Sequence, residues 1–206
     1  MTLPFSREAF LDTFGAYNLA LWGVAAGLWF ATAVVAWVWW RDSRRSQALV
    51  LALLAVHWWW SGLVYHWVYF RAINPAASVF AAVFVLQGLI LARAAVTGRQ
   101  PPTDLARWRQ LTACGFISFG LAYPIIGVIT GLTWPRLPLF AVPCPTTLVT
   151  AGWLIGSRGV PRVASVIPLL WAAIGSTAAA SLGIRADLAL VAAAVVLAVN
   201  LARPAA

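Results

Sequence analysis

The stretch TWPRLPLFAVPCPTT, residues 133–147, interrupts a chain that otherwise consists mostly of long apolar runs. Four of its residues are prolines, which lack a backbone N–H and clash with the preceding helical turn, so residues 134–144 are not expected to form a regular helix. Proline is well suited to the first helical position, which makes Pro145 the expected start of a helix with Cys144 as its N-cap. The pattern therefore predicts an extended segment followed by a helix over residues 145–157.

This predicted helix is too short to cross a bilayer by itself. About 13 residues at about 1.5 Å each reach about 20 Å, whereas the hydrocarbon core is about 30 Å thick. Extended backbone at membrane depth has to face protein or a water-filled cavity. We therefore expect residues 137–144 to dip into the bilayer among other helices, with Cys144 at the bottom of a vestibule. The alternative is that Pro-Cys-Pro only makes a tight turn, in which the thiol packs as a small apolar group.

The composition of the whole chain indicates an integral membrane protein. Of its 206 residues, 63% are hydrophobic and 9% are charged, which leaves too few polar residues to cover a water-soluble globule. Together with the short helix, six further apolar runs near the roughly 20 residues of a spanning helix predict an all-α bundle of about seven spans. We expect it to form a single transmembrane domain over residues 1–206. The six runs are 17–40, 47–70, 78–96, 111–132, 161–181 and 187–202.

All 14 basic residues are arginines, and their distribution predicts how the chain lies in the membrane. With seven spans, the side of the amino terminus carries Arg7, Arg71, Arg136 and Arg185. The opposite side carries Arg41, Arg44, Arg45, Arg93, Arg99, Arg107, Arg109, Arg158, Arg162 and Arg203. Because arginine is in excess on the cytoplasmic side of membrane proteins, we expect the amino terminus outside and the carboxyl terminus in the cytoplasm. The scatter of these arginines over short loops argues against a nucleic-acid partner.

Three stretches look least like generic membrane helix, and all three fall on the side of the amino terminus. They are FGAYN (14–18), YHWVYFRAINPAA (65–77) and the proline-rich segment. A ligand-binding site is therefore expected to open on that side. Its candidate residues are polar side chains in or near these stretches: Asn18, Tyr65, His66, Asn74, Gln87, Cys144, Thr146 and Thr147.

Two of these assignments have a physical rationale and an alternative. A half-helix that begins inside the membrane points free N–H groups into the vestibule, where the hydroxyls of Thr146 and Thr147 would add donors for an anionic group. Asn74 is expected either to line the same polar path as His66 or simply to cap the helix that Pro75 starts.

The sequence contains few residues that could bind a metal or a cofactor. Cys114 and Cys144 are expected at opposite membrane faces, and His57 and His66 lie about 180° apart and about 13 Å apart along one helix. Neither a haem site nor a zinc site is therefore evident, and the cofactor stays unknown. His66 together with Cys144 is a weak candidate pair for a soft metal such as Cu(I).

Small residues predict where helices approach each other, whereas no pattern predicts catalysis. The pairs Gly23/Gly27 and Gly127/Gly131 have the GxxxG spacing that lets two helix backbones come close. The five acidic residues all lie at span ends or in loops, so no pair of carboxylates for acid–base chemistry is expected within the bilayer. No catalytic residue is assigned.

The motifs YHWxYFxxINPAA (65–77) and VPCPTT (142–147), together with FGAYN, resemble those of an uncharacterised family of bacterial multi-span membrane proteins, a domain of unknown function. The resemblance covers most of the chain. It implies a bacterial inner-membrane location and no established activity, so it assigns no functional residue.

Two classes of function stay open at this point. The first is a transporter, channel or binding protein that takes up an ion or small molecule through an outer vestibule. The second is an accessory subunit that binds helices of a larger membrane complex, a pigment, a quinone or a second copy of itself. An enzyme is less favoured because the chain shows no catalytic constellation.

Overall fold

The computed structural model describes residues 3–97 and 105–202 of the protein, without the side chains of residues 43–45. This part of the chain is all-helical and contains no strand, which confirms the predicted fold class. Its seven α-helices are α1 (Arg7–Arg41), α2 (Ser43–Trp60), α3 (Ala77–Thr97), α4 (Arg107–Ile129), α5 (Pro143–Ile155), α6 (Val166–Leu182) and α7 (Ala189–Ala202). Shorter elements are the π-helix η1 (Ser61–Tyr69) and the 3-10 helices η2 (Phe70–Ala72), η3 (Arg162–Ser165) and η4 (Arg185–Leu188).

Six helical stretches are long and apolar enough to cross a membrane, so the chain is an integral membrane protein. They are α1, α2 continued through η1 and η2, α3, α4, η3 with α6, and η4 with α7. The first one begins at Arg7, well before the predicted residue 17. The reason is a local N-cap, because the Ser6 hydroxyl accepts a hydrogen bond from the N–H of Ala9 at 3.2 Å.

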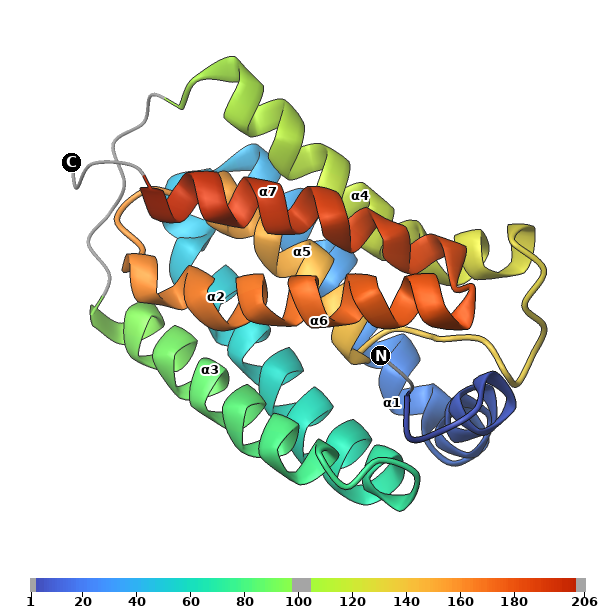
Figure 1. Ribbon diagram of the computed structural model, residues 1–206. Helices are drawn as coiled ribbons and strands as arrows, with labels where there is room; N and C mark the ends of the chain where they lie inside the picture. The colour runs from blue at the N-terminus through green and yellow to red at the C-terminus, as the bar shows by residue number, and fades with distance from the viewer. Residues whose placement is uncertain (1–2, 98–104, 203–206) are drawn as a thin grey trace.

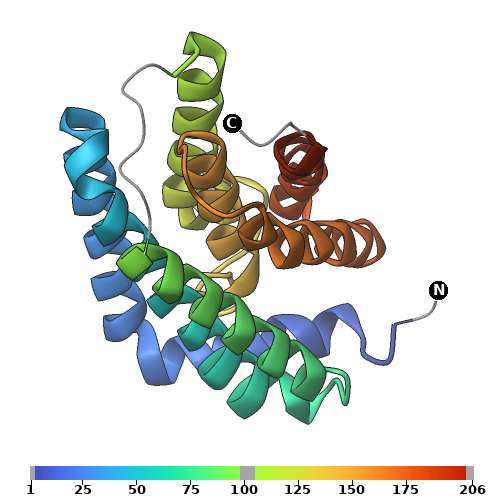
Figure 2. The ribbon, with the colours of Figure 1, turned by 90° about the vertical axis from the view of Figure 1, so that its left-hand side faces the viewer.

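The seventh helix, α5, is the predicted short one, although it starts two residues earlier than expected. Its N-cap is Val142 in an extended conformation (φ −105°, ψ 164°), so Cys144 lies within the first turn instead of capping it. All its residues except Cys144 are buried. The helix lies in the middle of the bundle against α4, α7, α6 and α2 (Figures 1 and 2). With 13 residues, α5 is not one of the six stretches that are long enough to cross a membrane.

The segment before α5 is non-helical, as predicted, but it consists of turns and bends instead of extended backbone, and part of it is buried. Leu137, Phe140 and Ala141 are buried. The side-chain amide of Asn18 donates to two carbonyls of this segment, at 2.7 Å to Pro135 and 2.6 Å to Leu137. These bonds supply partners for backbone groups that have no helix to satisfy them.

The core of the bundle is mostly apolar, and some of its polar side chains make hydrogen bonds between helices. Trp58 of α2 packs on Phe84 of α3 with ring centroids 4.4 Å apart, and its indole N–H donates to the Thr150 hydroxyl of α5 at 2.9 Å. Gly152 lets α5 approach α4, because a Cβ there would lie 2.9 Å from the carbonyl oxygen of Ala113. The short helix is therefore locked to its neighbours by packing and by hydrogen bonds.

The described chain ends lie at opposite ends of the bundle (Figure 1). We call the end where α1, α3, α5 and α7 begin, and where η2, α4 and α6 finish, the amino-terminal end. All three unusual sequence stretches meet there, as predicted, because each contributes residues to one cavity. Of the arginines counted for the orientation, Arg99 and Arg203 lie outside the described residues, as do the side chains of Arg44 and Arg45.

Candidate functional site

A cavity of about 130 Å³ lies at the amino-terminal end of the bundle. Its walls are mostly apolar, and many of them are aromatic rings. The segments that contribute residues are the start of α1, η1 and η2, the start of α3, α4, the start of α5, α6 and η4. The polar side chains in its lining are Tyr65, His66, Asn74, Tyr123, Cys144, Trp171 and Asp187.

The π-helix η1 explains why two neighbouring polar side chains both face this cavity. Hydrogen bonds from residue i to i+5 widen each turn beyond the 3.6 residues of an α-helix, and such segments are rare and often mark functional sites. In η1 and its continuation, buried positions follow as Ser61–Gly62, Tyr65–His66 and Phe70. Gly62 allows the close approach to α3, because a Cβ there would lie 3.0 Å from the carbonyl oxygen of Ala81.

His66 is a fully buried polar side chain that makes no hydrogen bond to the described residues. Its side chain is 0% exposed, and neither ring nitrogen has a hydrogen-bond partner among the described residues. Its ring lies 4.6 Å from the Phe84 ring and 5.0 Å from the Trp171 ring, measured between centroids. The Tyr65 hydroxyl and the Trp171 indole N–H are likewise buried without a partner.

A buried polar group without a hydrogen bond costs about 1–3 kcal/mol, and most such groups in proteins are satisfied by protein or water. Here four unsatisfied nitrogen and oxygen atoms, on Tyr65, His66 and Trp171, come from residues that line one cavity. A molecule in the cavity with its own donors and acceptors would offset that cost.

Asp187 is the charged residue of the site. It lies in η4, directly before α7, and its side chain is 4% exposed. The Tyr123 hydroxyl donates a hydrogen bond to its carboxyl group, and the Cys144 thiol lies within hydrogen-bonding reach of the same group. Among the described residues, no arginine lines the cavity.

The start of α5 differs from the anion site that the sequence predicted. Pro143 and Pro145 have no N–H, and the N–H of Thr146 already donates to Val142 at 3.2 Å, so the first turn keeps only the N–H of Cys144. The Thr147 hydroxyl donates to the carbonyl of Pro143 at 2.9 Å. Thr146 lies beside the Ser61 hydroxyl, at 3.5 Å, and neither threonine lines the cavity.

The remaining candidate residues divide in the same way. Asn74 lines the cavity, while its side-chain oxygen accepts from the N–H of Ala76 at 3.1 Å, a turn-making role. The Asn18 side chain donates to carbonyls of the segment before α5, as described above. Gln87 donates to the carbonyl of Ala164 at 2.8 Å. The structure thus brings Tyr65, His66, Asn74 and Cys144 together and leaves Asn18, Gln87, Thr146 and Thr147 outside the cavity lining.

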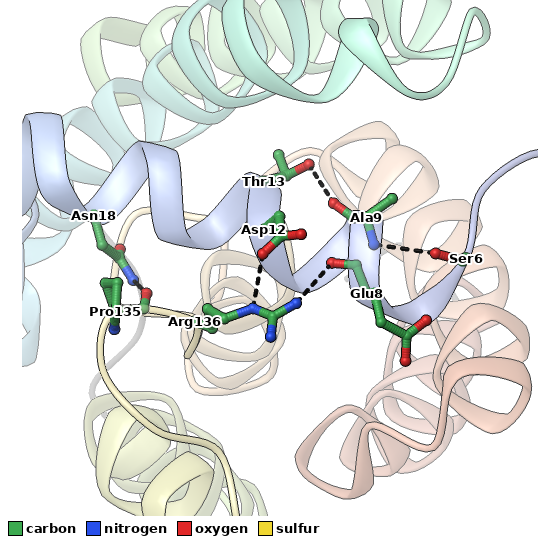
Figure 3. Close-up of polar contacts among 8 residues, drawn as sticks. All are labelled: Ser6, Glu8, Ala9, Asp12, Thr13, Asn18, Pro135 and Arg136. Carbon is green, nitrogen blue, oxygen red and sulfur yellow. Dashed lines mark hydrogen bonds and ion pairs between the residues drawn. The ribbon is translucent and has the colours of Figure 1, made fainter.

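The first turns of α1 cover the open end of the cavity. This part of α1 lies across the end of the bundle before the helix turns along it (Figure 2). Phe5, Phe10 and Phe14 line the cavity from this segment. On its other side Arg136 pairs with Asp12 at 2.8 Å and donates to the carbonyl of Glu8 at 3.3 Å (Figure 3).

A further bond ties the same segment to the opposite wall of the cavity. The guanidinium Nε of Arg7 donates to the carbonyl of Leu182, at the end of α6, at 2.9 Å. The cover is therefore attached both to the segment before α5, through Arg136, and to α6.

Within residues 3–97 and 105–202, no group of three or more histidine, cysteine, aspartate and glutamate side chains is placed to hold a metal ion. His66 and Cys144 do line the same cavity, so the two-ligand Cu(I) site stays a prediction. The described residues show no haem or zinc ligands beyond those considered from the sequence.

Three residues of the site were missed by sequence reasoning. Asp187 was counted among the acidic residues at span ends or in loops, and neither Tyr123 nor Trp171 was assigned to the site. A usable signal existed for Asp187, which lies within an 18-residue apolar stretch from Arg185 to Ala202. No comparable signal marked Tyr123, because a tyrosine near a helix end is common at membrane interfaces.

Comparison with known proteins adds a family to this geometry. A family model described as a family of unknown function (DUF6064) matches residues 7–205. Neither the curated proteins nor the solved structures include a match to the chain. Because the family model covers almost the whole chain, including every described helix and most of the residues that line the cavity, this protein belongs to the family of unknown function DUF6064.

Proposed function

We propose that this protein binds a small molecule within the bilayer, in the cavity at the amino-terminal end of the bundle. The single observation that supports this most directly is the set of buried polar atoms without partners on Tyr65, His66 and Trp171. Other buried side chains with an unpartnered polar atom, such as Trp153 and Gln87, lie outside the cavity lining, whereas these three residues line one cavity. The unpaired atoms therefore favour a bound partner.

The cavity limits the ligand in size and polarity. A cavity of about 150 Å³ holds benzene in another protein, and this one measures about 130 Å³. The ligand is thus a compact molecule with an apolar body. At least one polar group is needed to reach His66 and Tyr65.

We assign the cavity to the outer face of the bacterial cytoplasmic membrane as part of the same proposal. Among the described residues, the amino-terminal end of the bundle has the smaller share of arginines, Arg7, Arg71, Arg136 and Arg185, whereas the other end has Arg41, Arg44, Arg45, Arg93, Arg107, Arg109, Arg158 and Arg162. By the positive-inside rule the arginine-poor end faces outward. The ligand would then enter from outside, beneath the first turns of α1.

Protection of Cys144 from a thiol reagent tests the binding site. In a Cys114→Ser background Cys144 is the single thiol, and methyl methanethiosulfonate is small enough for the cavity. The probes are choline, its uncharged isostere 3,3-dimethylbutan-1-ol, and 3,3-dimethylbutanoate. We expect at least one of them to slow the modification of Cys144, with an effect that saturates as the probe concentration rises. Intact-protein mass spectrometry measures the rate of modification.

A pair of alanine variants on α6 provides the control. Ala178 lines the cavity, whereas Ala180 is exposed on another face of the same helix. Ala178→Phe should abolish the protection, and Ala180→Phe should leave it unchanged. The proposal is wrong if none of the three probes protects Cys144, or if protection survives Ala178→Phe.

A further inference from the structure

We infer that the ligand of the cavity is a small organic cation, an ammonium group with short alkyl substituents, and that Asp187 is its counter-ion. This rests on the proposed function and adds the charge and chemical class of the ligand. The observations that support it are the charge of the lining, the aromatic walls and the arrangement at the start of α5.

The charge of the lining is negative and uncompensated by a cation of the chain. Asp187 is buried, and its partners Tyr123 and Cys144 are neutral donors. In the described part of the protein, no arginine reaches the cavity, and Arg136, at the same end, pairs with Asp12 outside it. An ionisable group within a membrane is costly unless it is paired. A cationic ligand supplies the missing partner.

The aromatic walls suit the rest of such a ligand. Phe80 and Trp171 line the cavity beside His66, with ring centroids 5.7 and 5.0 Å from the imidazole. Phe5, Phe10 and Phe14 close the opposite wall. Aromatic faces attract alkylammonium groups through their quadrupole, most strongly where water is excluded, and they also pack against alkyl substituents.

The start of α5 disfavours an anionic ligand. Two prolines remove N–H donors from its first turn, and the positive end of the helix is already met by the Asp187 carboxyl beside Cys144. At the start of α5, a bound anion would therefore face a carboxyl group with only one free backbone donor, the N–H of Cys144, to compensate. A bound cation would instead be attracted by the Asp187 carboxyl group.

The test compares ligands of equal shape and different charge on the purified full-length protein in detergent micelles. Choline and 3,3-dimethylbutan-1-ol differ in a quaternary nitrogen against a quaternary carbon, and 3,3-dimethylbutanoate carries the opposite charge. Isothermal titration calorimetry should give a dissociation constant for choline at least tenfold lower than for the alcohol. The carboxylate should bind most weakly.

Two carboxyl variants test whether Asp187 is responsible for the tighter binding of choline. Asp187→Asn should raise the dissociation constant for choline at least tenfold and change that for the alcohol by less than about threefold. Glu8→Gln removes an exposed carboxylate from the same end of the bundle but outside the cavity, and should leave both constants unchanged. Tyr123→Phe, which removes the hydroxyl bonded to Asp187, should weaken choline binding while retaining the charge.

The outcomes separate this inference from the proposed function. If the alcohol or the carboxylate binds as tightly as choline, the cation assignment is wrong while the binding site stands. If none of the three binds, the proposed function itself fails. The charge series uses the unmodified chain, so it decides the question even if Asp187→Asn does not fold.

Discussion

The two halves of the second membrane helix each bury a histidine, and the two histidines have different surroundings. His57 lies in the α-helical half, where its Nε2 is 2.9 Å from the Thr32 hydroxyl and its ring packs edge-on against Phe140. His66 lies in the π-helical half, where neither nitrogen has a partner and the side chain borders a cavity. Burial alone therefore does not mark a site. His57 lacks a partner only for Nδ1, whereas both nitrogens of His66 lack one and its side chain lies next to empty volume.

The same difference separates two buried tryptophans. The Trp58 N–H donates to Thr150 in the core, whereas the Trp171 N–H, beside His66, has no hydrogen-bond partner in the described part of the chain. One region is built like the interior of a stable bundle. The other keeps donors and acceptors available at the cost of some stability, as binding sites commonly do.

Truncation of the two histidines should give the largest contrast. His57→Ala leaves a void in a closed core and should lower the free energy of unfolding by about 2–4 kcal/mol. His66→Ala enlarges an existing cavity and removes two unsatisfied nitrogens, so its loss should be below about 1 kcal/mol. Thermal unfolding in detergent micelles measures both variants against the wild type. Equal losses would remove the distinction drawn between the two histidines.

Removing the indole N–H should also distinguish Trp58 from Trp171, with a smaller difference in stability than for the two histidines. Trp58→Phe breaks the bond to Thr150 and leaves that hydroxyl bonded to the carbonyl of Thr146, so we expect a loss of about 1–2 kcal/mol. Trp171→Phe removes the same buried ring atoms but an N–H that has no hydrogen-bond partner among the described residues, so it should cost about 1 kcal/mol less than Trp58→Phe. Denaturant titration of both variants is the measurement. A larger loss for Trp171→Phe would mean that its N–H is satisfied within the protein.

The smallest expected effect concerns glycines. Gly62→Ala places a Cβ 3.0 Å from the Ala81 carbonyl oxygen in α3 and should cost about 1 kcal/mol, because rigid backbone has to move. Gly23→Ala meets nothing within 4 Å and should leave stability unchanged or raise it slightly. A destabilised Gly23→Ala variant would show that this face of α1 is covered by a partner in the protein studied.

Several features of the fold were predictable from local chemistry. Prolines prevent helix in the segment before α5 and start the helix that follows, and the bounds of α3 differ by a single residue at each end from the apolar run 78–96. The GxxxG pairs were less informative. A Cβ at Gly23 or Gly27 would contact nothing within 4 Å, whereas one at Gly152 would collide with α4. Spacing along one helix does not reveal which face meets a neighbour.

The candidate site was predictable only in part. Tyr65, His66, Asn74 and Cys144 were identified because they sit in stretches that depart from generic membrane helix, and they do line one cavity. Thr146 and Thr147 were also assigned to it, but their hydroxyls lie outside its lining, because Thr147 bonds back to its own helix and Thr146 faces Ser61. Their positions depend on how α5 is rotated, which its sequence does not specify.

By itself, the sequence determined that the chain lies in a membrane, that it is helical, and that proline interrupts it once near Cys144. These properties follow from composition and from the covalent structure of proline, which act locally. The tertiary structure decided that η1 is a π-helix turning both Tyr65 and His66 inward, and that Asp187 and Tyr123, 64 residues apart, meet beside Cys144. Such contacts depend on how helices pack against each other, and side-chain types along a single helix leave that choice open.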